Sequence, residues 1–139
     1  MNGYEKPLPE ITDDNRGFWE AAAAKRELHL QQCGECGHIR YPVAPCCPNC
    51  LSERFRWSPV SGRGTVYSSV VYHQVYHAAF RDEVPYNVSM IQLEEGPRMI
   101  SNVVGVQDGR VAVGTPVEVT FDQVTDSVAI PRFRIVTEG

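Results

Sequence analysis

The sequence contains no long apolar run and no leader-like segment at its start. Its alanine-rich stretch, residues 21–24, is bounded by Glu20 and Lys25, whereas about 18–20 apolar residues are needed to cross a bilayer. The opening residues have no basic region followed by an apolar stretch, so we expect no signal peptide. We therefore predict a cytoplasmic protein without a membrane partner, in which thiols stay reduced and paired cysteines favour metal over disulfide.

Positive charge is also scarce. The 139 residues carry 13 Lys and Arg against 17 Asp and Glu, which gives a formal net charge of −4. Affinity for nucleic acid rests largely on neutralising phosphates with Lys and Arg, so this composition does not favour a nucleic-acid partner. The length suits one domain, or a small module joined to a modest one.

Catalytic constellations are missing as well. The Gly62-Arg63-Gly64 segment lacks the spacing and the Lys-Ser/Thr ending of a phosphate loop, and we interpret it as a turn into a strand. Glu94 and Glu95 are adjacent, so on a strand they point to opposite faces and form no acid/base pair. No Ser-His-Asp or Cys-His set has support in the sequence. The residues alone therefore point to no catalytic site.

The sequence does contain two Cys-x2-Cys pairs, Cys33–Cys36 and Cys47–Cys50, separated by ten residues. One tight turn lets each pair aim two thiolates at a single ion, and two facing turns complete a tetrahedron. Four protein ligands close the coordination shell, which predicts a structural metal site rather than a hydrolytic one. Zinc fits this donor set, although iron also accepts four thiolates, so the spacing leaves the metal open.

Three further side chains near these pairs are alternative ligands. Cys46 could replace Cys47 by forming a Cys-x3-Cys pair, but Cys47-Pro-x-Cys50 is the better knuckle. His29 and His38 flank the first pair, where four thiolates already suffice. We therefore predict one zinc ion bound by Cys33, Cys36, Cys47 and Cys50, with Cys46 as a free thiol.

The remaining pattern predicts a mainly β protein. We expect an N-terminal arm and helix in residues 1–28, a zinc ribbon in 29–57 and a β-domain in 58–139. The helix is expected over residues 16–28, and the strands over 65–76, 86–93, 99–106, 116–121 and 127–136. Five short strands without a long helix among them predict a five-stranded OB-fold barrel.

Phe18 and Trp19 are the notable aromatic residues of the expected helix. One interpretation is that they pack on the ribbon or barrel of this protein. The other is that they form a hydrophobic face for a partner or ligand.

Taken in order, these segments resemble a known family. The matching segments are Gly17–Glu20, Cys33–Gly37, Tyr41-Pro42, Cys47–Cys50, Ser61–Tyr67, Val84–Tyr86, Gln92–Gly96, Gly114–Val117 and Pro131–Phe133. The chain is similar to acyl-CoA-associated OB-fold proteins with an N-terminal helix and rubredoxin-like zinc ribbon. One departure is Leu51, which follows the second knuckle where many knuckles place glycine.

The resemblance implies a non-catalytic accessory subunit. Its partners would be thiolase-fold acyl-CoA enzymes, namely thiolases or the lipid-transfer-protein-type aldolases that cleave steroid side chains, together with MaoC-type hydratases in some members. The subunit would dock on the enzyme, order its active site and help to bind or transfer acyl-CoA. We expect Phe18, Trp19, Arg63 and Tyr86 to contact the partner or acyl-CoA.

Two alternatives remain open at this stage. Zinc ribbons and OB-folds also bind single-stranded nucleic acid, and Tyr67, Tyr72, Tyr76 and Tyr86 could stack on bases, although few basic residues flank them. A four-thiolate site that held iron would instead indicate an electron carrier.

Overall fold

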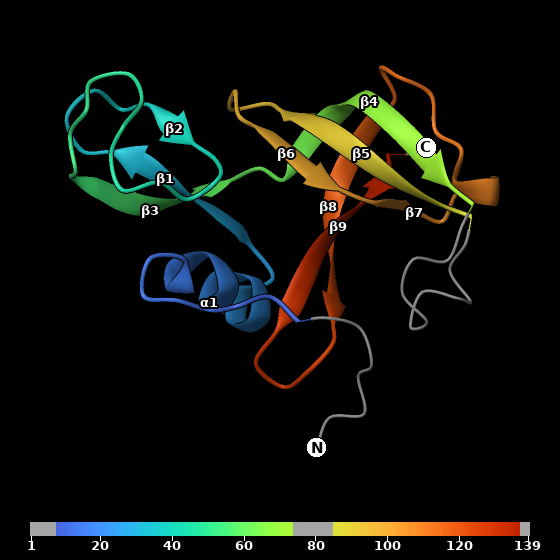
Figure 1. Cartoon of the computed structure of the whole chain (residues 1–139), viewed down its shortest axis with the longest axis horizontal. Coiled ribbons are helices and arrows are strands. Elements are labelled where there is room, and N and C mark those ends of the chain that lie inside the picture. Colours follow the sequence, from blue (N-terminus) through green and yellow to red (C-terminus); the bar gives the residue numbers. More distant parts are fainter. Residues whose placement is uncertain (1–7, 74–84, 137–139) are drawn as a thin grey trace.

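The computed structural model describes residues 8–73 and 85–136, and Figure 1 shows their arrangement. Helix α1 (Arg16–Lys25) precedes a three-stranded antiparallel sheet of order β2-β1-β3, formed by β1 (Leu28–Cys33), β2 (Ile39–Arg40) and β3 (Phe55–Val60). Neither α1 nor the short helix η2 (Gln107–Gly109) in these ranges is long and apolar enough to span a membrane.

The second sheet has the order β6-β5-β4-β8-β9-β7. Its strands are β4 (Arg63–Tyr72), β5 (Tyr86–Leu93), β6 (Arg98–Ser101), β7 (Val103–Val104), β8 (Pro116–Gln123) and β9 (Ala129–Ile135). The third expected strand, 99–106, is divided at Asn102. Its first part, β6, pairs with β5, and its second part, β7, pairs in parallel with β9. Because one segment joins both ends of the sheet, the sheet closes into an OB-fold barrel. The predicted fold class is confirmed.

Several expected boundaries were wrong. The helix was expected to reach Leu28, but it ends at Lys25 because Arg26 adopts a left-handed conformation with φ of 55°. Leu28 instead begins β1, a strand that we had not predicted. The first barrel strand starts at Arg63 rather than Thr65. Residues 74–76, which were expected to end that strand, lie outside the described residues.

The buried face of β5 includes two polar side chains. Asn87 and Ser89 are buried together with Ile91 and Leu93, while Tyr86 is only half-buried. Asn87 can face inward because both ends of its side-chain amide form hydrogen bonds. Its Nδ2 donates to the carbonyl of Val103 at 2.8 Å, and its Oδ1 accepts from the Val103 N–H at 2.8 Å. A buried polar side chain thereby joins β5 to β7, where the barrel closes.

One hydrophobic core runs through the ribbon and the barrel. Phe18 of α1 and Leu28 and Leu30 of β1 belong to the same buried cluster as Ile91 and Phe133 of the barrel. Figure 1 shows α1 between the ribbon sheet and the β8–β9 hairpin. The helix thus connects the two sheets through packing.

Close approach of α1 to the ribbon requires a glycine. A Cβ atom built on Gly17 would lie 2.3 Å from Nε1 of Trp57, on β3. The indole of Trp57 therefore packs directly against the helix backbone, and this contact fixes the helix on the ribbon.

Candidate metal centre and adjoining pockets

The two Cys-x2-Cys segments form matching turns. The Gly37 N–H donates to the carbonyl of Cys33 at 3.1 Å, and the Leu51 N–H donates to the carbonyl of Cys47 at 2.8 Å. Gly37 and Leu51 both adopt positive φ, at 79° and 67°. Leu51 thus has the backbone conformation of the glycine that it replaces, with a side chain 74% exposed.

These turns bring four sulfur atoms together. The Sγ atoms of Cys33, Cys36, Cys47 and Cys50 all lie within 4.8 Å of one another. The Cys33–Cys50 pair is separated by 3.5 Å and the Cys36–Cys47 pair by 3.7 Å. Four sulfurs at such separations are the donor set of a tetrahedral zinc or iron site, so the residues fit the metal that their spacing predicts.

Nearby N–H groups favour the thiolate form at two of the four sulfurs, those of Cys33 and Cys36. The backbone N–H groups of Cys36 and Glu35 point at Cys33 Sγ and lower the pKa of that thiol to about 6. The side-chain amide of Asn49 donates to Cys36 Sγ at 3.5 Å and lowers the pKa of Cys36. Both effects favour the thiolate, which is the form that binds metal.

The alternative ligands lie outside this cluster. Among the described residues, the metal-binding group contains the four predicted cysteines only. Cys46 is a half-buried thiol without a disulfide partner among the described residues. The Nε2 atom of His29 lies 2.8 Å from Oε1 of Glu27, so this imidazole has a carboxylate partner of its own.

The structure separates the two aromatic residues of α1. Phe18 is 5% exposed and belongs to the core, which leaves little of its ring for a partner. Trp19 is half-buried, and its ring meets Phe18 edge to face with centroids 5.0 Å apart. A partner contact at this helix therefore stays a prediction that concerns Trp19 more than Phe18.

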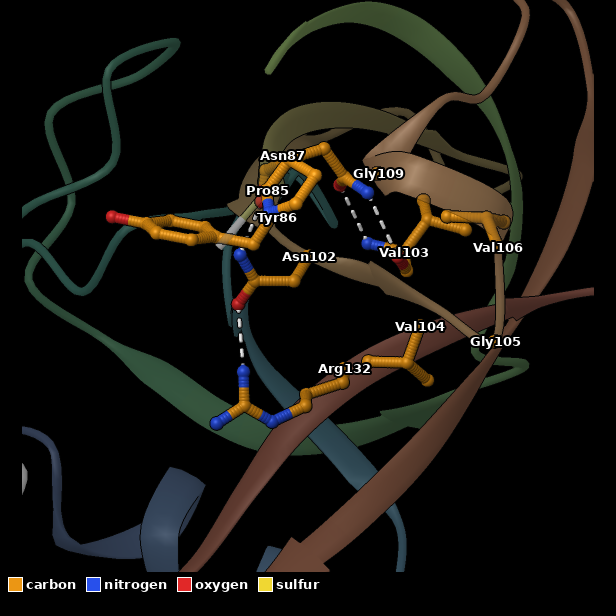
Figure 2. Close-up of a pocket in the computed structure, with 10 residues that line it drawn as sticks. All are labelled: Pro85, Tyr86, Asn87, Asn102, Val103, Val104, Gly105, Val106, Gly109 and Arg132. Atoms are coloured by element: carbon orange, nitrogen blue, oxygen red, sulfur yellow. Dashed lines mark hydrogen bonds between the residues drawn. The ribbon is translucent and has the colours of Figure 1, made fainter. Parts of the chain in front are cut away.

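Tyr86 lies at the mouth of a cavity of about 230 Å³ at the end of the barrel where β5, β7 and β9 meet. Its ring stacks on Tyr72, with centroids 5.5 Å apart. Figure 2 shows that the ring of Tyr86 points away from the valines on the opposite wall. Asn102 lies between Tyr86 and Arg132, and its Oδ1 accepts from Arg132 Nη1 at 2.8 Å.

Sequence reasoning missed Asn102 and Arg132 in this cavity. The β9 side chain of Arg132 is 15% exposed and also donates to Asp122 Oδ2 at 3.1 Å. Only the parallel pairing of β7 with β9 brings these residues to Tyr86, and no local pattern in the sequence signals that pairing.

Arg63 lies apart from both sites. It is exposed at the start of β4 and lines a cavity of about 670 Å³ whose lining also includes Glu94 and Glu118. Glu118 is paired with Arg134 at 2.8 Å, and Glu94 accepts from the Ser61 hydroxyl, so the lining adds no second cation to Arg63 that would favour a phosphate group. The structure therefore does not bring Arg63, Tyr86 and Trp19 into one site.

Two family models match consecutive parts of the chain. Residues 21–56 match the model described as "ChsH2, rubredoxin-like zinc ribbon domain". Residues 57–122 match the model described as "ChsH2, C-terminal OB-fold domain". The first match, together with the sulfur cluster, identifies the cofactor as zinc.

Individual relatives agree with these matches. A benzoylsuccinyl-CoA thiolase subunit BbsA from Thauera aromatica is 30% identical, over 91% of this chain and 86% of the relative. A solved chain described as "Ltp2-ChsH2(DUF35) aldolase" is 36% identical with a TM-score of 0.81, and the match covers 94% of this chain and all of that one.

A third relative is longer. A probable enoyl-CoA hydratase alpha subunit from Thermomonospora curvata is 40% identical over 93% of this chain. The chain spans only 40% of the length of that relative.

Proposed function

This chain belongs to the family of ChsH2-type proteins that join a rubredoxin-like zinc ribbon to an OB-fold domain, and we propose that it is an accessory subunit of a thiolase-fold acyl-CoA enzyme. The observation that carries this proposal is the similarity, over 94% of this chain, to a chain of an aldolase whose name combines Ltp2 and ChsH2. A subunit of a thiolase supports it.

The chemistry of the described residues supports a role without catalysis. The zinc site has four protein ligands, so it offers no open position for a catalytic water or substrate. The arginine beside the Tyr86 cavity is already bonded to Asp122 and Asn102, which makes it a structural cation. The proposed role is to dock on the enzyme, to order its active site and to assist the binding or transfer of acyl-CoA.

Two contacts follow from this role. Trp19 is the proposed anchor for the enzyme, because its indole is half-buried on a helix that is fixed to both sheets. Tyr86, at the cavity of about 230 Å³, is the proposed contact for acyl-CoA. Arg63 is a weaker candidate because its cavity adds no second cation.

The proposal also covers a second partner, the cellular compartment, the domain division and the acyl substrate. A MaoC-type hydratase is a second partner, in keeping with the hydratase subunit among the relatives. Zinc thiolates and a free Cys46 suit a reducing compartment, so we propose the cytoplasm. We divide the chain into an arm and helix (1–28), the ribbon (29–57) and the OB-fold domain (58–139). A steroid side chain is the proposed acyl substrate of an aldolase partner.

An affinity pull-down from the native host at moderate salt, followed by mass spectrometry, tests the proposal. We expect a thiolase-fold protein in near-stoichiometric amount. Recovery of the chain alone, or with nucleic acid that is released by salt, would refute it.

The Trp19→Ala variant tests the anchor separately. We expect a weaker complex from a chain that still folds, because Trp19 lies at the edge of the core. Tyr67→Ala is a matched control, since it removes a 49% exposed aromatic ring from the barrel. An equal loss of partner in both variants would contradict a specific anchor on the helix.

A further inference from the structure

The outward side of β5 is apolar over the same stretch in which its inward side is polar. The two buried polar side chains of this strand point into the barrel, so Val88 and Met90, which alternate with them, point outward. Neighbouring strands extend this surface, since Val70 of β4 lies opposite Val88. On the other side, Ile100 of β6 lies opposite Met90. Directly paired residues share one face of a sheet, so these four side chains form a single outer apolar face.

Folding alone does not account for this face. Ile100 is 62% exposed and Val70 is 56% exposed, while Val88 and Met90 are half-buried. An antiparallel sheet that has one side in water normally carries polar residues on that side. Single exposed apolar residues are common on protein surfaces, whereas a contiguous set across three strands is typical of an interaction site. The outer apolar face is therefore a candidate docking surface.

The strands that form this face contain no acidic residue. Strands β4, β5 and β6 include neither Asp nor Glu, although the chain has 17 of them. Their two charged residues are Arg63, which lines the separate cavity described above, and Arg98. Arg98 lies two positions before Ile100 on β6, so it extends from the same side of the sheet at the edge of the face. The face is thus neutral at its centre and positive at one edge.

Arg98 is held in place without a carboxylate partner. Its Nε donates to Oε1 of Gln92 at 2.8 Å, and its guanidinium carbon lies 3.9 Å from the centre of the Tyr67 ring. Among residues 8–73 and 85–136, no ion pair joins it to Asp or Glu. A positioned guanidinium beside an apolar surface favours a partner that supplies a carboxylate, because the two groups form charge-assisted hydrogen bonds.

A second copy of this chain does not supply that carboxylate. In a symmetric dimer formed through this face, each copy would present the same three strands to the other. Those strands hold no Asp or Glu, so both Arg98 guanidinium groups would lose water without gaining a counter-charge. The face therefore matches a different protein rather than another copy of this chain.

The face also lies away from helix α1. The helix makes its main contacts with β1, β8 and β9, whereas β5 lies between β4 and β6 in the sheet. Because the sheet is closed, strands on different sides of the barrel direct their outward side chains in different directions. Figure 1 shows α1 beside the lower part of the β8–β9 hairpin, with β5 above it. A contact at Trp19 and a contact at the outer apolar face are therefore separate.

We propose that the outer apolar face is a docking surface for a second protein, whose complementary surface is apolar at its centre and carries a carboxylate that pairs with Arg98. The four apolar residues of the face supply the buried contact, and Arg98 fixes its orientation. This protein is other than the enzyme that is proposed to bind at Trp19, so the inference does not depend on the identity of that enzyme.

Site-specific photo-cross-linking of the whole, zinc-loaded chain in its native host tests this surface. The variant Ile100→p-benzoylphenylalanine places the cross-linker on the face, and Val113→p-benzoylphenylalanine places it at a 69% exposed valine outside the three strands. Mass spectrometry of the joined peptides identifies what touches each position. At position 100 we expect one dominant peptide from another protein, which is apolar and has Asp or Glu near the cross-linked residue. At position 113 we expect no dominant peptide.

Reversing one charge tests the role of Arg98. Arg98→Glu places a carboxylate opposite the one expected on the partner, and Arg110→Glu is its matched control, because Arg110 is also exposed but lies outside the three strands. We expect Arg98→Glu to lower the cross-linking yield at position 100 by about tenfold or more, because like-charge repulsion replaces a charge-assisted hydrogen bond. Changing the partner's carboxylate to a lysine should restore the yield. Arg110→Glu should leave it unchanged.

The outcomes separate this docking surface from the proposed function. Trp19→Ala should keep the cross-link at position 100, because the two contacts are separate. Absence of a thiolase-fold protein from the pull-down, with this cross-link intact, would refute the proposed function alone. The docking surface would be overturned by a cross-link to a second copy of the chain, by no cross-link, or by its disappearance in Trp19→Ala. Equal yields in Arg98→Glu and Arg110→Glu would overturn it too.

Discussion

Leu51 occupies a backbone conformation that favours glycine. We therefore predict that glycine at this position gives a more stable chain than alanine, which is the reverse of the usual order. A side chain in the left-handed region is unfavourable by roughly 1–2 kcal/mol, whereas glycine loses about 0.4–1 kcal/mol more through the entropy of the unfolded chain. We therefore expect Leu51→Gly to be more stable than Leu51→Ala by about 0.5–1 kcal/mol. Glycine is ordinarily the less stable of the two inside regular structure.

Comparing Leu51→Gly with Leu51→Ala isolates the effect of the backbone conformation on stability. Leu51 is 74% exposed, so either variant loses the same small amount of packing. Gly37→Ala is the mirror-image control in the first knuckle. A Cβ atom on Gly37 would meet nothing within 4 Å, so its effect reports only the positive φ of 79°. We expect Gly37→Ala to destabilise the chain by about the amount that separates the two Leu51 variants.

Thermal unfolding of the zinc-loaded variants measures these differences. For a chain of this size, about 0.5–1 kcal/mol corresponds to a shift in Tm of about 2–5 °C. Competition with a zinc chelator gives a second measure, because folding of the ribbon is coupled to metal binding. Equal stability of Leu51→Gly and Leu51→Ala would refute the assignment of strain to this knuckle.

Three further predictions concern the helix contact, the barrel closure and the metal. Gly17→Ala should lower stability by about 1–3 kcal/mol in denaturant unfolding, because its methyl group would overlap the Trp57 indole, and an unchanged midpoint would contradict that packing. Asn87→Ala should be destabilising by at least about 2 kcal/mol, since it leaves the buried N–H and carbonyl of Val103 without their partner, whereas Ser69→Ala on the neighbouring strand should have a much smaller effect. Removal of zinc with a chelator should unfold the ribbon, as seen by loss of dispersed amide signals, and stoichiometric zinc should restore them.

The metal site could be predicted from the sequence because its geometry is local. Each Cys-x2-Cys turn is closed by its own backbone hydrogen bonds, so the spacing of Cys33 and Cys36 already implies two sulfurs on one side of a turn. The choice of Cys47 over Cys46 followed from the same argument, and in the structure the Sγ of Cys47 lies among the four clustered sulfurs. The strand pattern predicted the barrel, and the resemblance to known proteins then added the class of partner.

Features that depend on tertiary pairing could not be predicted. A strand over residues 86–93 was predicted, but the burial of Asn87 on it depends on hydrogen bonds to Val103, which lies 16 positions further along the chain. The division of the third barrel strand at Asn102 also depends on tertiary pairing, because β7, after the break, pairs with β9. Strand β1 was missed because its alternation is short and precedes the first knuckle directly.

Arg40 and Glu95 illustrate this limit most clearly. In the sequence Arg40 carries no signal, and the adjacent Glu94 and Glu95 showed only that they form no acid/base pair. Burial of Arg40 follows from β2 pairing with β1, where Gln31 lies opposite. Both residues line a cavity of about 460 Å³, which follows from the packing of the whole ribbon against the β5–β6 turn. No window of neighbouring residues contains that information.

The continuous core indicates how zinc influences a barrel that contains none of its ligands. Strand β1 ends at the ligand Cys33 and delivers Leu28 and Leu30, each 1% exposed, into the cluster that includes Phe133. The same strand holds Gln31, which positions Arg40 at the cavity. Zinc therefore fixes a strand that also serves the barrel core. Chelation should accordingly lower the midpoint of barrel unfolding in denaturant, because the barrel core loses the fixed positions of Leu28 and Leu30. An unchanged midpoint after removal of zinc would show that β1 stays in place without the metal.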